Sequence, residues 1–483
     1  MAELEISKLE ESEAQEQLVS INNALANFKT AAERVPAYKK FLESESVDPS
    51  KIKTIDDFEK FVPLINKDNY LRKYPLNELC LDGNLFTTNL ISSSSGSSGK
   101  PFFWPRGNEQ HEEATKFYKD IYEQSFGVKE KKSLIVVCFS MGTWIAGTYT
   151  LLGSLGVANL GHNINVATPG IDKADAINVI KDLGDYYDQI IIAGYPPFIK
   201  DVIDLGEVSG IDWKSKTVKF SFAGEAISEQ WRDQIIARVG GNIKPTDTAN
   251  IYGTADAGII GFETPLSITL RRAVLAQNES EKIFNNTILP SLVQYDASRR
   301  YFEEIDNELI FTAPSGIPLI RYNIRDNGGV MKTSDFMKTL KIDNFDNKLL
   351  ENNNHHRFVY INGRNDFAIS FYALLIYPEN IKVGLESEEI SKYVSGKFIM
   401  KTEHDEDLQQ VFKLIIELKP NVIGDEIIKN EILKAVTNRL IKNNAEYRKL
   451  HTTLGKQAEP NITLMQFNDK EYFDKTNKHK WVE

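Results

Sequence analysis

A run rich in serine and glycine is the strongest chemical signal in the sequence. It reads Ser94-Ser95-Gly96-Ser97-Ser98-Gly99-Lys100-Pro101. Glycines let backbone N–H groups approach a ligand closely, and serine hydroxyls donate hydrogen bonds to phosphate oxygens, so the run predicts a phosphate-binding loop. It is not a Walker loop, because two residues separate Gly96 from Gly99 and a proline follows Lys100. Its composition also suits a flexible linker, which is the alternative interpretation.

Four further motifs follow this run in chain order. They are Phe222-Ala223-Gly224-Glu225, Ile251-Tyr252-Gly253-Thr254-Ala255-Asp256, residues 318–326 ending in Arg325-Asp326, and Gly363-Arg364-Asn365-Asp366. Each is weak alone, since Tyr-Gly ends many strands and Gly-Arg-x-Asp suits a turn. In this order, the motifs resemble the adenylate-forming superfamily of acyl-CoA synthetases and related ligases. The segments 34–38, 55–58 and 63–67 resemble the N-terminal region of its phenylacetate–CoA ligase branch.

The resemblance implies a binding site for ATP. The Ser/Gly run would hold the β- and γ-phosphates while pyrophosphate leaves, and Gly224 and Glu225 would line the adenine. Tyr252 would stack on the adenine ring, Asp326 would accept hydrogen bonds from the ribose, and Arg364 would lie near the ribose and α-phosphate. The nucleotide-binding residues that it implies are Ser94, Ser95, Gly96, Ser97, Ser98, Gly99, Lys100, Gly224, Glu225, Tyr252, Gly253, Thr254, Asp326 and Arg364.

The resemblance also implies a catalytic lysine and a hinge. A lysine near the C-terminus would enter the active site during adenylation, and within residues 476–482 the candidate is Lys478. Lys480 and Lys475 are alternatives within the register of the match, and a basic chain end without catalytic use is the other interpretation. Asp366 would be the hinge between a large and a small domain.

One motif departs from the family pattern near the expected metal. Asp256 would help to hold Mg²⁺, since this hard cation prefers oxygen ligands. The family usually has Glu there, and Ala255 replaces a usual Ser or Thr hydroxyl. Asp is shorter by one methylene, so its metal contact would need a water or a shifted loop. The departures indicate either lower activity or a subfamily with its own geometry.

Three aromatic residues occupy positions where the resemblance would place walls of the pocket for the acid substrate. They are Trp144, Tyr195 and Phe262. The alternative is that each is a core aromatic.

The elements that must position these residues alternate between strand and helix. Buried apolar runs predict strands, and segments between them have helical periodicity. The expected strands are 133–139, 189–193, 218–222 and 250–252, and the expected helices are 109–126, 174–183, 197–206 and 229–239. This alternation predicts an α/β fold with layered parallel sheets.

The two ends of the sequence lack this regular alternation of strand and helix patterns. Leu18, Ile21, Leu25 and Phe28 predict an amphipathic N-terminal helix. After residue 290, short strands at 292–295, 308–312 and 319–325 predict an antiparallel β subdomain near 290–345. Residues 347–356 read as a polar loop with His355 and His356 exposed to solvent. A strand at 412–418 and a helix at 425–442 predict a small α+β unit.

We therefore expect an adenylation domain at residues 1–366 that binds ATP and the acid. A small, mobile α+β domain would follow at residues 367–483.

Composition limits the function classes. The 483 residues carry 57 Lys and Arg against 68 Asp and Glu, for a net charge of −11, which opposes general attraction to nucleic acid or an anionic membrane. The two cysteines make no disulfide framework, and the longest apolar runs are strand-length. We expect a cytoplasmic enzyme that acts on small molecules, and a homodimer is compatible with the sequence.

The function that the resemblance implies is ligation in two steps. ATP would activate a carboxylic acid, aryl or arylacetic, as an acyl-adenylate, and the acyl group would pass to coenzyme A. Related branches use an amine, a hydroxyl or a carrier-protein thiol as the acceptor, and the sequence does not exclude these. A degenerate member that binds nucleotide or a partner protein without catalysis is the hypothesis from another class.

Overall fold

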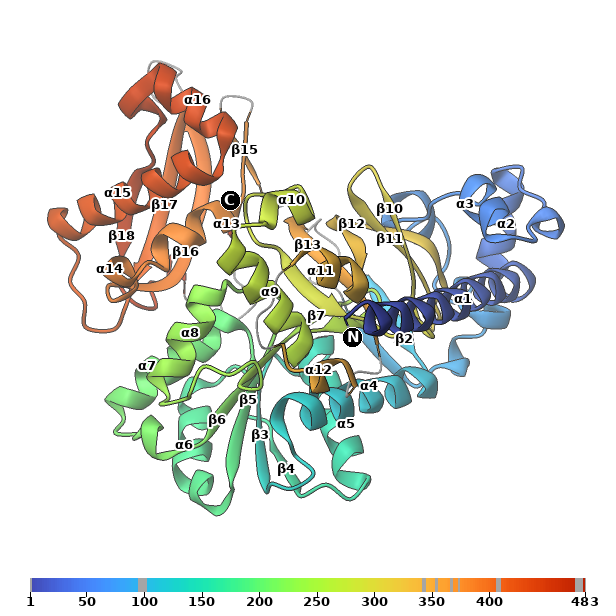
Figure 1. Cartoon of the computed structure of the whole chain (residues 1–483), viewed down its shortest axis with the longest axis horizontal. Coiled ribbons are helices and arrows are strands. Elements are labelled where there is room, and N and C mark those ends of the chain that lie inside the picture. The colour runs from blue at the N-terminus through green and yellow to red at the C-terminus, as the bar shows by residue number, and fades with distance from the viewer. Residues whose placement is uncertain are drawn as a thin grey trace.

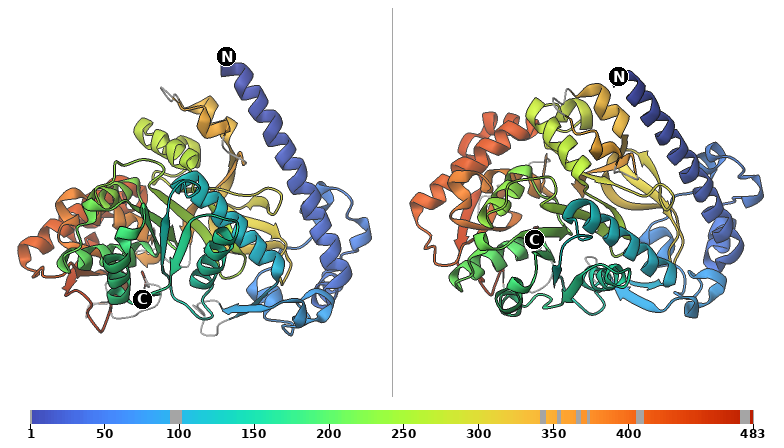
Figure 2. Two further views of the ribbon diagram at one scale, coloured as in Figure 1. Left: turned by 90° about the horizontal axis from the view of Figure 1, so that it is seen from below. Right: turned by 60° about the horizontal axis from the view of Figure 1, so that its bottom comes forward.

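The computed structural model describes residues 2–93, 102–340, 345–351, 355–364, 368–371, 374–404, 410–473 and 481–482. A large mixed sheet forms the centre of the molecule, and α1 (Ala2–Arg34) and the C-terminal α+β part lie on opposite sides of it (Figures 1 and 2). No helix in the described ranges is long and apolar enough to cross a membrane.

Eleven strands of the described residues form the large sheet. In spatial order they are β10 (Tyr301–Ile305), β11 (Glu308–Ala313), β12 (Leu319–Lys332), β13 (Arg357–Arg364), β9 (Ser291–Gln294), β8 (Gly258–Phe262), β7 (Thr248–Thr254), β6 (Val218–Ala223), β5 (Gln189–Gly194), β3 (Ser133–Cys138) and β4 (Ile164–Ala167). From β7 to β4 the strands pair in parallel, and from β7 to β10 they pair antiparallel. The short strands expected after residue 290 therefore extend the large sheet.

Alternate residues of the parallel strands face two helical layers, as the twofold period of a strand requires. Leu134 and Val136 pack with α6 (Lys173–Leu183), α7 (Pro196–Val208) and α8 (Glu229–Arg238). Ile135 and Val137 pack with α4 (Asn108–Ile121) and α5 (Ile145–Asn159). The fold class predicted from the sequence is confirmed, with layers of helices on a largely parallel half-sheet.

Helices α4 and α5 approach each other closely because glycines line the contact. A Cβ atom built on Gly153 would lie 2.2 Å from the Tyr118 ring, so only glycine leaves room for that ring. The Tyr118 hydroxyl then reaches Thr150 Oγ1 at 2.6 Å. This layer fixes the position of the loop that precedes α5.

The N-terminal helix buries most of the stripe expected. Phe28 is buried, and Ile21 and Leu25 pack against the same core, whereas Leu18 is 59% exposed. α1 contacts β10, β11 and β12, and small alanine side chains let it lie close to them. α2 (Pro36–Ser44) and α3 (Ile55–Phe61) complete this helical layer, and the Thr54 and Asp57 side chains form a capping box at the start of α3.

The segment 347–356, expected to be a polar loop, contains a helical turn. α12 (Lys348–Glu351) lies within it, and His355 is 8% exposed. The His356 backbone N–H donates to the Glu16 carboxylate of α1 at 3.0 Å. The expectation that both histidines are solvated was wrong, because α1 covers this segment, which is a contact distant in sequence.

The remaining helices of the large part follow β8 and β12. They are α9 (Pro265–Gln277), α10 (Ser280–Phe284) and α11 (Thr333–Thr339). Apolar side chains of all three share a core with strands β9 and β13. This core covers one face of the antiparallel half of the sheet.

The C-terminal part has its own sheet and core. Its elements are β14 (Ile369–Phe371), β15 (Leu374–Ile376), α13 (Pro378–Leu385), α14 (Glu388–Ser391), β16 (Val394–His404), β17 (Gln410–Leu418), α15 (Glu426–Asn443), α16 (Ala445–Leu454) and β18 (Asn461–Met465). β17 pairs antiparallel with β16 and parallel with β18, and α15 packs on this sheet. The expected hinge, Asp366, lies outside the described residues, so the domain boundary stays a prediction.

Charged and polar contacts join the C-terminal part to the large part. Lys397 of β16 lies 2.5 Å from the Asp201 carboxylate of α7, and 3.3 Å from Glu417. Burial alone would lower the pKa of Lys397, but these two carboxylates outweigh it and raise the pKa. At a second point, Ser228 donates to the Glu386 carboxylate, and Gln234 Nε2 donates to the Glu386 carbonyl at 2.7 Å.

Glu386 makes this contact sensitive to pH. Burial raises its pKa from 4.5 to about 7, although the bond from Ser228 and the charges of Lys382 and Arg271 oppose the rise. A raised carboxyl pKa gives stability that is full below pH 4.5 and is lost as the pH rises through 7. We predict that Glu386→Gln, which is neutral at every pH, is more stable than the parent protein at about pH 8. Its unfolding free energy should be higher by up to about 3 kcal/mol, and its Tm should be higher accordingly.

Thermal unfolding across pH measures this difference, which should vanish near about pH 5. Glu388→Gln, an exposed neighbour on α14, is the matched control and should leave the pH profile unchanged. A gap between Glu386→Gln and the parent that is constant with pH would contradict the prediction.

Candidate functional site

The candidate residues gather at the carboxyl ends of adjacent parallel strands, where α/β sheets bind ligands. Tyr195 follows β5, Gly224 and Glu225 follow β6, and Tyr252 lies near the end of β7. Since Ala193 pairs with Ser221 and Ala223 pairs with Ile251, these ends are aligned in register. The sheet order therefore brings the second and third motifs together.

Tyr252 and Asp326 are in direct contact. The Tyr252 hydroxyl donates to Asp326 Oδ2 at 2.5 Å, and Asp326 is 3% exposed. Asp326 is also the cross-strand partner of Arg364 in the β12–β13 pair. The structure thus joins three of the implied nucleotide residues from three different motifs.

The backbone before Asp326 has an uncommon conformation. Arg325 has φ of +65°, a left-handed value that costs energy for a residue with a side chain. Its backbone N–H donates to Asn323 Oδ1 at 2.7 Å, and its Nη2 donates to Asp68 Oδ2 at 2.9 Å. The register between β12 and β13 shifts between Asn327 and Gly328, so β12 is irregular directly after Asp326.

Gly224 is required by the close approach of Tyr195. Gly224 has φ of +89°, and a Cβ atom on it would lie 2.4 Å from Tyr195 Cε1. Burial, together with the charge of Glu225, raises the pKa of Tyr195 to about 12, so this phenol stays neutral. The Tyr195 and Phe139 rings meet edge-on with their centroids 5.1 Å apart, which holds Tyr195 beside Gly224.

Asp256 lies in a buried polar cluster that sequence reasoning did not find. Lys67 Nζ lies 2.9 Å from Asp256 Oδ2, and the Tyr322 hydroxyl donates to the same oxygen at 2.5 Å. Arg106 of β2 (Phe103–Arg106) donates to the Ala255 carbonyl. Lys67 belongs to the segment 63–67, and Tyr322 belongs to the segment 318–326, so both lay inside recognised motifs. Their partners are far away in sequence, which is why no local pattern indicated the contact.

This cluster does not fit a resident magnesium ion in its present arrangement. The lysine ammonium already supplies a positive charge at Asp256, whose side chain is 4% exposed. Within the described residues, no group of three or more His, Cys, Asp or Glu side chains could hold a metal. Asp256 as a magnesium ligand stays a prediction that requires Lys67 to move.

Several predicted residues lie outside the described parts of the chain. They are Ser94 to Lys100, Asp366 and Lys478. The Ser/Gly run lies between β1 (Leu90–Ser93) and β2, which pair antiparallel with Ser93 opposite Phe103. Ser93 also bonds the Thr143 carbonyl at 2.9 Å beside Trp144. The strands that bracket the run are therefore anchored next to one expected pocket wall.

The expected pocket walls lie in different surroundings. Tyr195 lies beside Gly224, Trp144 lies beside Ser93, and Phe262 is buried with its ring 5.7 Å from Phe117. Tyr195 and Phe262 share one apolar cluster. Their assignment as walls of an acid pocket stays a prediction.

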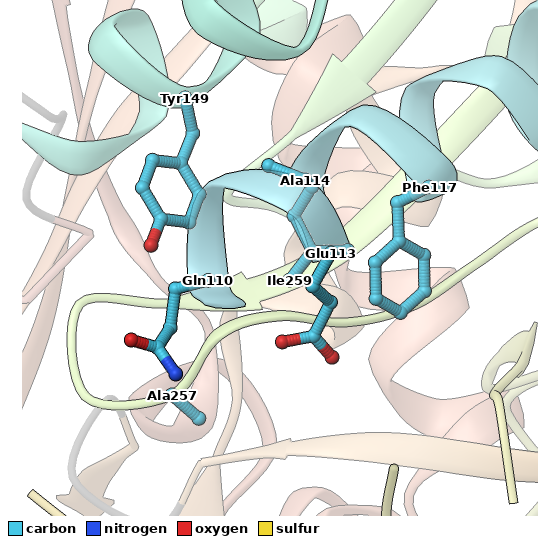
Figure 3. Close-up of a pocket in the computed structure, with 7 residues that line it drawn as sticks. All are labelled: Gln110, Glu113, Ala114, Phe117, Tyr149, Ala257 and Ile259. Carbon is cyan, nitrogen blue, oxygen red and sulfur yellow. The ribbon is translucent and has the colours of Figure 1, made fainter. Parts of the chain in front are cut away.

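A narrow pocket lies behind the Tyr252 motif. The residues around it come from α4, α5 and β8 with its preceding turn, and Figure 3 shows the Gln110 and Glu113 side chains on the same side of α4. The lining residues are Gln110, Glu113, Ala114, Phe117, Tyr149, Ala257 and Ile259. It has no room for a water molecule. Arg300 lies 2.9 Å from Glu113 Oε1 and donates to the Ile259 carbonyl at 3.0 Å, so these polar groups tie α4 to β8.

Comparison with known proteins places this geometry in a wider context. No protein-family model matches the chain. Over 299 residues, it is 22% identical to the phenylacetate-coenzyme A ligase of Aromatoleum evansii, and this match covers 61% of this chain and 62% of that enzyme. The match thus spans less than two thirds of the curated relative.

Solved structures match over almost the whole chain. A 2-hydroxyisobutyryl-CoA ligase in its postadenylation state has a TM-score of 0.69 at 14% identity, covering 97% of this chain and 90% of that one. The chain has the fold of the adenylate-forming superfamily. An acyl acid amido synthetase, AtGH3.15, in complex with 2,4-DB has this fold too, with a TM-score of 0.56, 14% identity and the same coverages. The resemblance stated from the motifs is confirmed, and the adenylate-forming fold includes enzymes with different acceptors.

The contact of Asp326 with Tyr252 generates a test of nucleotide binding. We predict that Asp326→Ala weakens ATP binding at least about tenfold, because charge-assisted hydrogen bonds to two ribose hydroxyls are worth roughly 1.5–3 kcal/mol each. Isothermal calorimetry measures the affinity, and circular dichroism checks the fold. Tyr252→Phe keeps the ring but removes the hydrogen bond to Asp326, so it should weaken ATP binding less than Asp326→Ala does. ATP affinity that is unchanged in folded Asp326→Ala would refute the assignment.

The Lys67–Asp256 pair generates a test of stability. We predict that Lys67→Met lowers the unfolding free energy by about 1–3 kcal/mol, because it leaves the buried Asp256 carboxylate without its counter-charge. Urea unfolding measures the loss, and adding Asp256→Asn should recover part of it. Lys73→Met, at an exposed lysine nearby, is the control. Equal stability of Lys67→Met and Lys73→Met would show that the pair contributes nothing.

Proposed function

We propose that the chain is an ATP-dependent ligase that activates a carboxylic acid as an acyl-adenylate and transfers the acyl group to coenzyme A. The observation that carries the proposal is the Tyr252–Asp326 bond at the carboxyl ends of the parallel strands. It joins motifs that would bind adenine and ribose, next to Arg364 across the strand pair. The match to a phenylacetate-coenzyme A ligase supports an aryl or arylacetic acid as the substrate.

In the first step the protein mainly positions the two reactants and stabilises the negative charge that develops. A carboxylate is already ionised at neutral pH, so its attack on the α-phosphorus of ATP requires no general base. The bond from the α-phosphorus to the bridging oxygen breaks as pyrophosphate leaves. Gly224, Glu225 and Tyr252 would hold the adenine, Asp326 the ribose, and the Ser/Gly run with Lys478 the developing negative charge. Because the cluster around Asp256 does not fit a resident metal ion, no step is assigned to one.

The second step transfers the acyl group. The thiol of coenzyme A attacks the acyl carbon, AMP leaves with the electron pair of the broken bond, and the thiol proton passes to solvent. A rotation of the small domain about Asp366 would withdraw Lys478 between the steps and open a path for the thiol.

An amine acceptor is the second candidate. The likeness to AtGH3.15, an acyl acid amido synthetase, supports it, with a TM-score of 0.56. A degenerate, non-catalytic protein is the third, and Ala255 and Asp256 are the departures that support it.

One experiment separates the three candidates. The protein is incubated with ATP, Mg²⁺ and a panel of aryl and alkyl carboxylic acids, and pyrophosphate release is measured for each acid. Coenzyme A, or a panel of amines, is then added, and mass spectrometry identifies the thioester or the amide. Pyrophosphate release with thioester supports the proposal, release with amide supports the second candidate, and no release with any acid supports the third.

The two half-reactions also test Lys478. We predict that Lys478→Ala slows acyl-adenylate formation by about 10²-fold or more, because that is the order lost with one preorganised donor. The same variant, given preformed acyl-adenylate, should make thioester at a nearly normal rate. Rapid-quench kinetics of each half-reaction measure the asymmetry.

The alternatives have distinct signatures. If both half-reactions slow equally, Lys478 acts on folding or substrate binding. If neither slows, the catalytic lysine is another residue, and Lys480→Ala and Lys475→Ala are the next variants.

A further inference from the structure

Lys382 connects the nucleotide motif with the C-terminal end of the chain. It lies on α13, and its Nζ is 3.2 Å from Glu225 Oε2. The same Nζ lies over the Trp481 ring, 4.1 Å from its centroid. One ammonium group therefore contacts a carboxylate of the large part and an aromatic face of the C-terminal part.

Both partners of Lys382 are held by further contacts. Trp481 is 6% exposed, its ring lies 4.6 Å from Phe398, and its carbonyl accepts the Met400 N–H at 2.8 Å. The Glu225 side chain is 5% exposed, and its carbonyl accepts a bond from Asn250 Nδ2 at 3.0 Å. The lysine thus links strand β16 to the ends of β6 and β7.

The contact between Glu225 and Trp481 through Lys382 depends on the charge of this one lysine. The Lys382 side chain is 14% exposed, so its charge is largely removed from water and depends on these partners. A cation over a tryptophan ring is attracted by the negative face of the ring, and the ion pair with Glu225 adds to this attraction. Glu379, one turn earlier on α13, lies near the same ammonium, and burial raises its pKa although Lys382 opposes this. Removing Lys382 would leave Glu225 without its cation.

Lys382 makes these two contacts in the arrangement of the two parts that the structure has. This arrangement is closer to the postadenylation state of the 2-hydroxyisobutyryl-CoA ligase, with a TM-score of 0.69, than to an open conformation of it, with a TM-score of 0.54.

We propose that Lys382 is a positioning residue for adenylation, which links Trp481 of the C-terminal part to Glu225 at the end of β6 and so holds the two parts in the arrangement that adenylation uses. This inference rests on the proposed function. Lys382 acts through Glu225 and Trp481, so it matters in the domain arrangement that brings them together. The acyl-transfer step, which follows release of that arrangement, does not depend on it.

Kinetics of the two half-reactions test the proposal. Lys382→Met should slow pyrophosphate release at least about tenfold, the loss that corresponds to about 1.4 kcal/mol, while thioester formation from preformed acyl-adenylate stays within about twofold. Lys382→Arg keeps the charge and should recover most of the rate. Lys392→Met is the matched control, since Lys392 is exposed and lies over Tyr393 at 4.6 Å, and it should change neither step.

A second readout does not depend on activity. Amide hydrogen exchange at Met400, whose N–H donates to Trp481, should become at least about tenfold faster in Lys382→Met and should stay unchanged at Leu414 in β17. Equal slowing of both half-reactions, no slowing, or unchanged exchange at Met400 overturns the proposal. If the parent protein releases no pyrophosphate with any acid, the proposed function fails, and the exchange experiment still decides whether Lys382 holds Trp481.

Discussion

The curvature of the large sheet is the constraint on which the candidate site depends. In the strand order, β13, β9 and β8 lie between β12 and β7. With neighbouring strands roughly 4.8 Å apart, a flat sheet would place β12 about 19 Å from β7. The Tyr252 hydroxyl of β7 nevertheless bonds Asp326 of β12 at 2.5 Å. The sheet must therefore curve so that its antiparallel half lies next to the ends of the parallel strands. Register shifts occur after Tyr252 in β7 and after Asn327 in β12, and such bulges increase the bending of a strand.

The same curvature explains why charged residues hold the loop between β7 and β8. Because the curvature brings β12 close to this loop, the Tyr322 hydroxyl donates to the Asp256 carboxylate. Lys67, from the N-terminal layer, contacts the same carboxylate. A buried carboxylate is stable only when its charge is compensated and its oxygens are hydrogen-bonded. The loop is thus fixed from two sides by groups that belong to recognised motifs. The segments around Lys67 and Tyr322 therefore have a structural role that their chain positions alone do not explain.

The parts of the fold that the sequence predicted are those with strong local signals. Buried apolar runs located β3, β5 and β6 within a residue or so at each end. β4 was missed because only Ile164 among its four residues is buried, and α5 was missed because its apolar and glycine-rich sequence has no polar face. For the site, the motifs supplied Tyr252 and Asp326 separately. The contact between them, like that of Lys67 with Asp256, depends on strand order and curvature, which no local pattern encodes.

Charged side chains make several of the contacts between the two parts of the chain. Lys397 with Asp201, Lys382 with Glu225, and Lys200 with the Val394 carbonyl at 3.3 Å bridge them. Separating apolar surfaces costs about 25 cal/mol for each Å² exposed, without compensation from water. Separated ions, by contrast, recover hydration that offsets much of the attraction they lose. An interface of this composition holds a defined arrangement while its ions are paired and still separates at moderate cost. The proposed ligase would need that combination, because its two steps would use two arrangements of the same domains, and the charged side chains between α7, α13 and β16 would supply it.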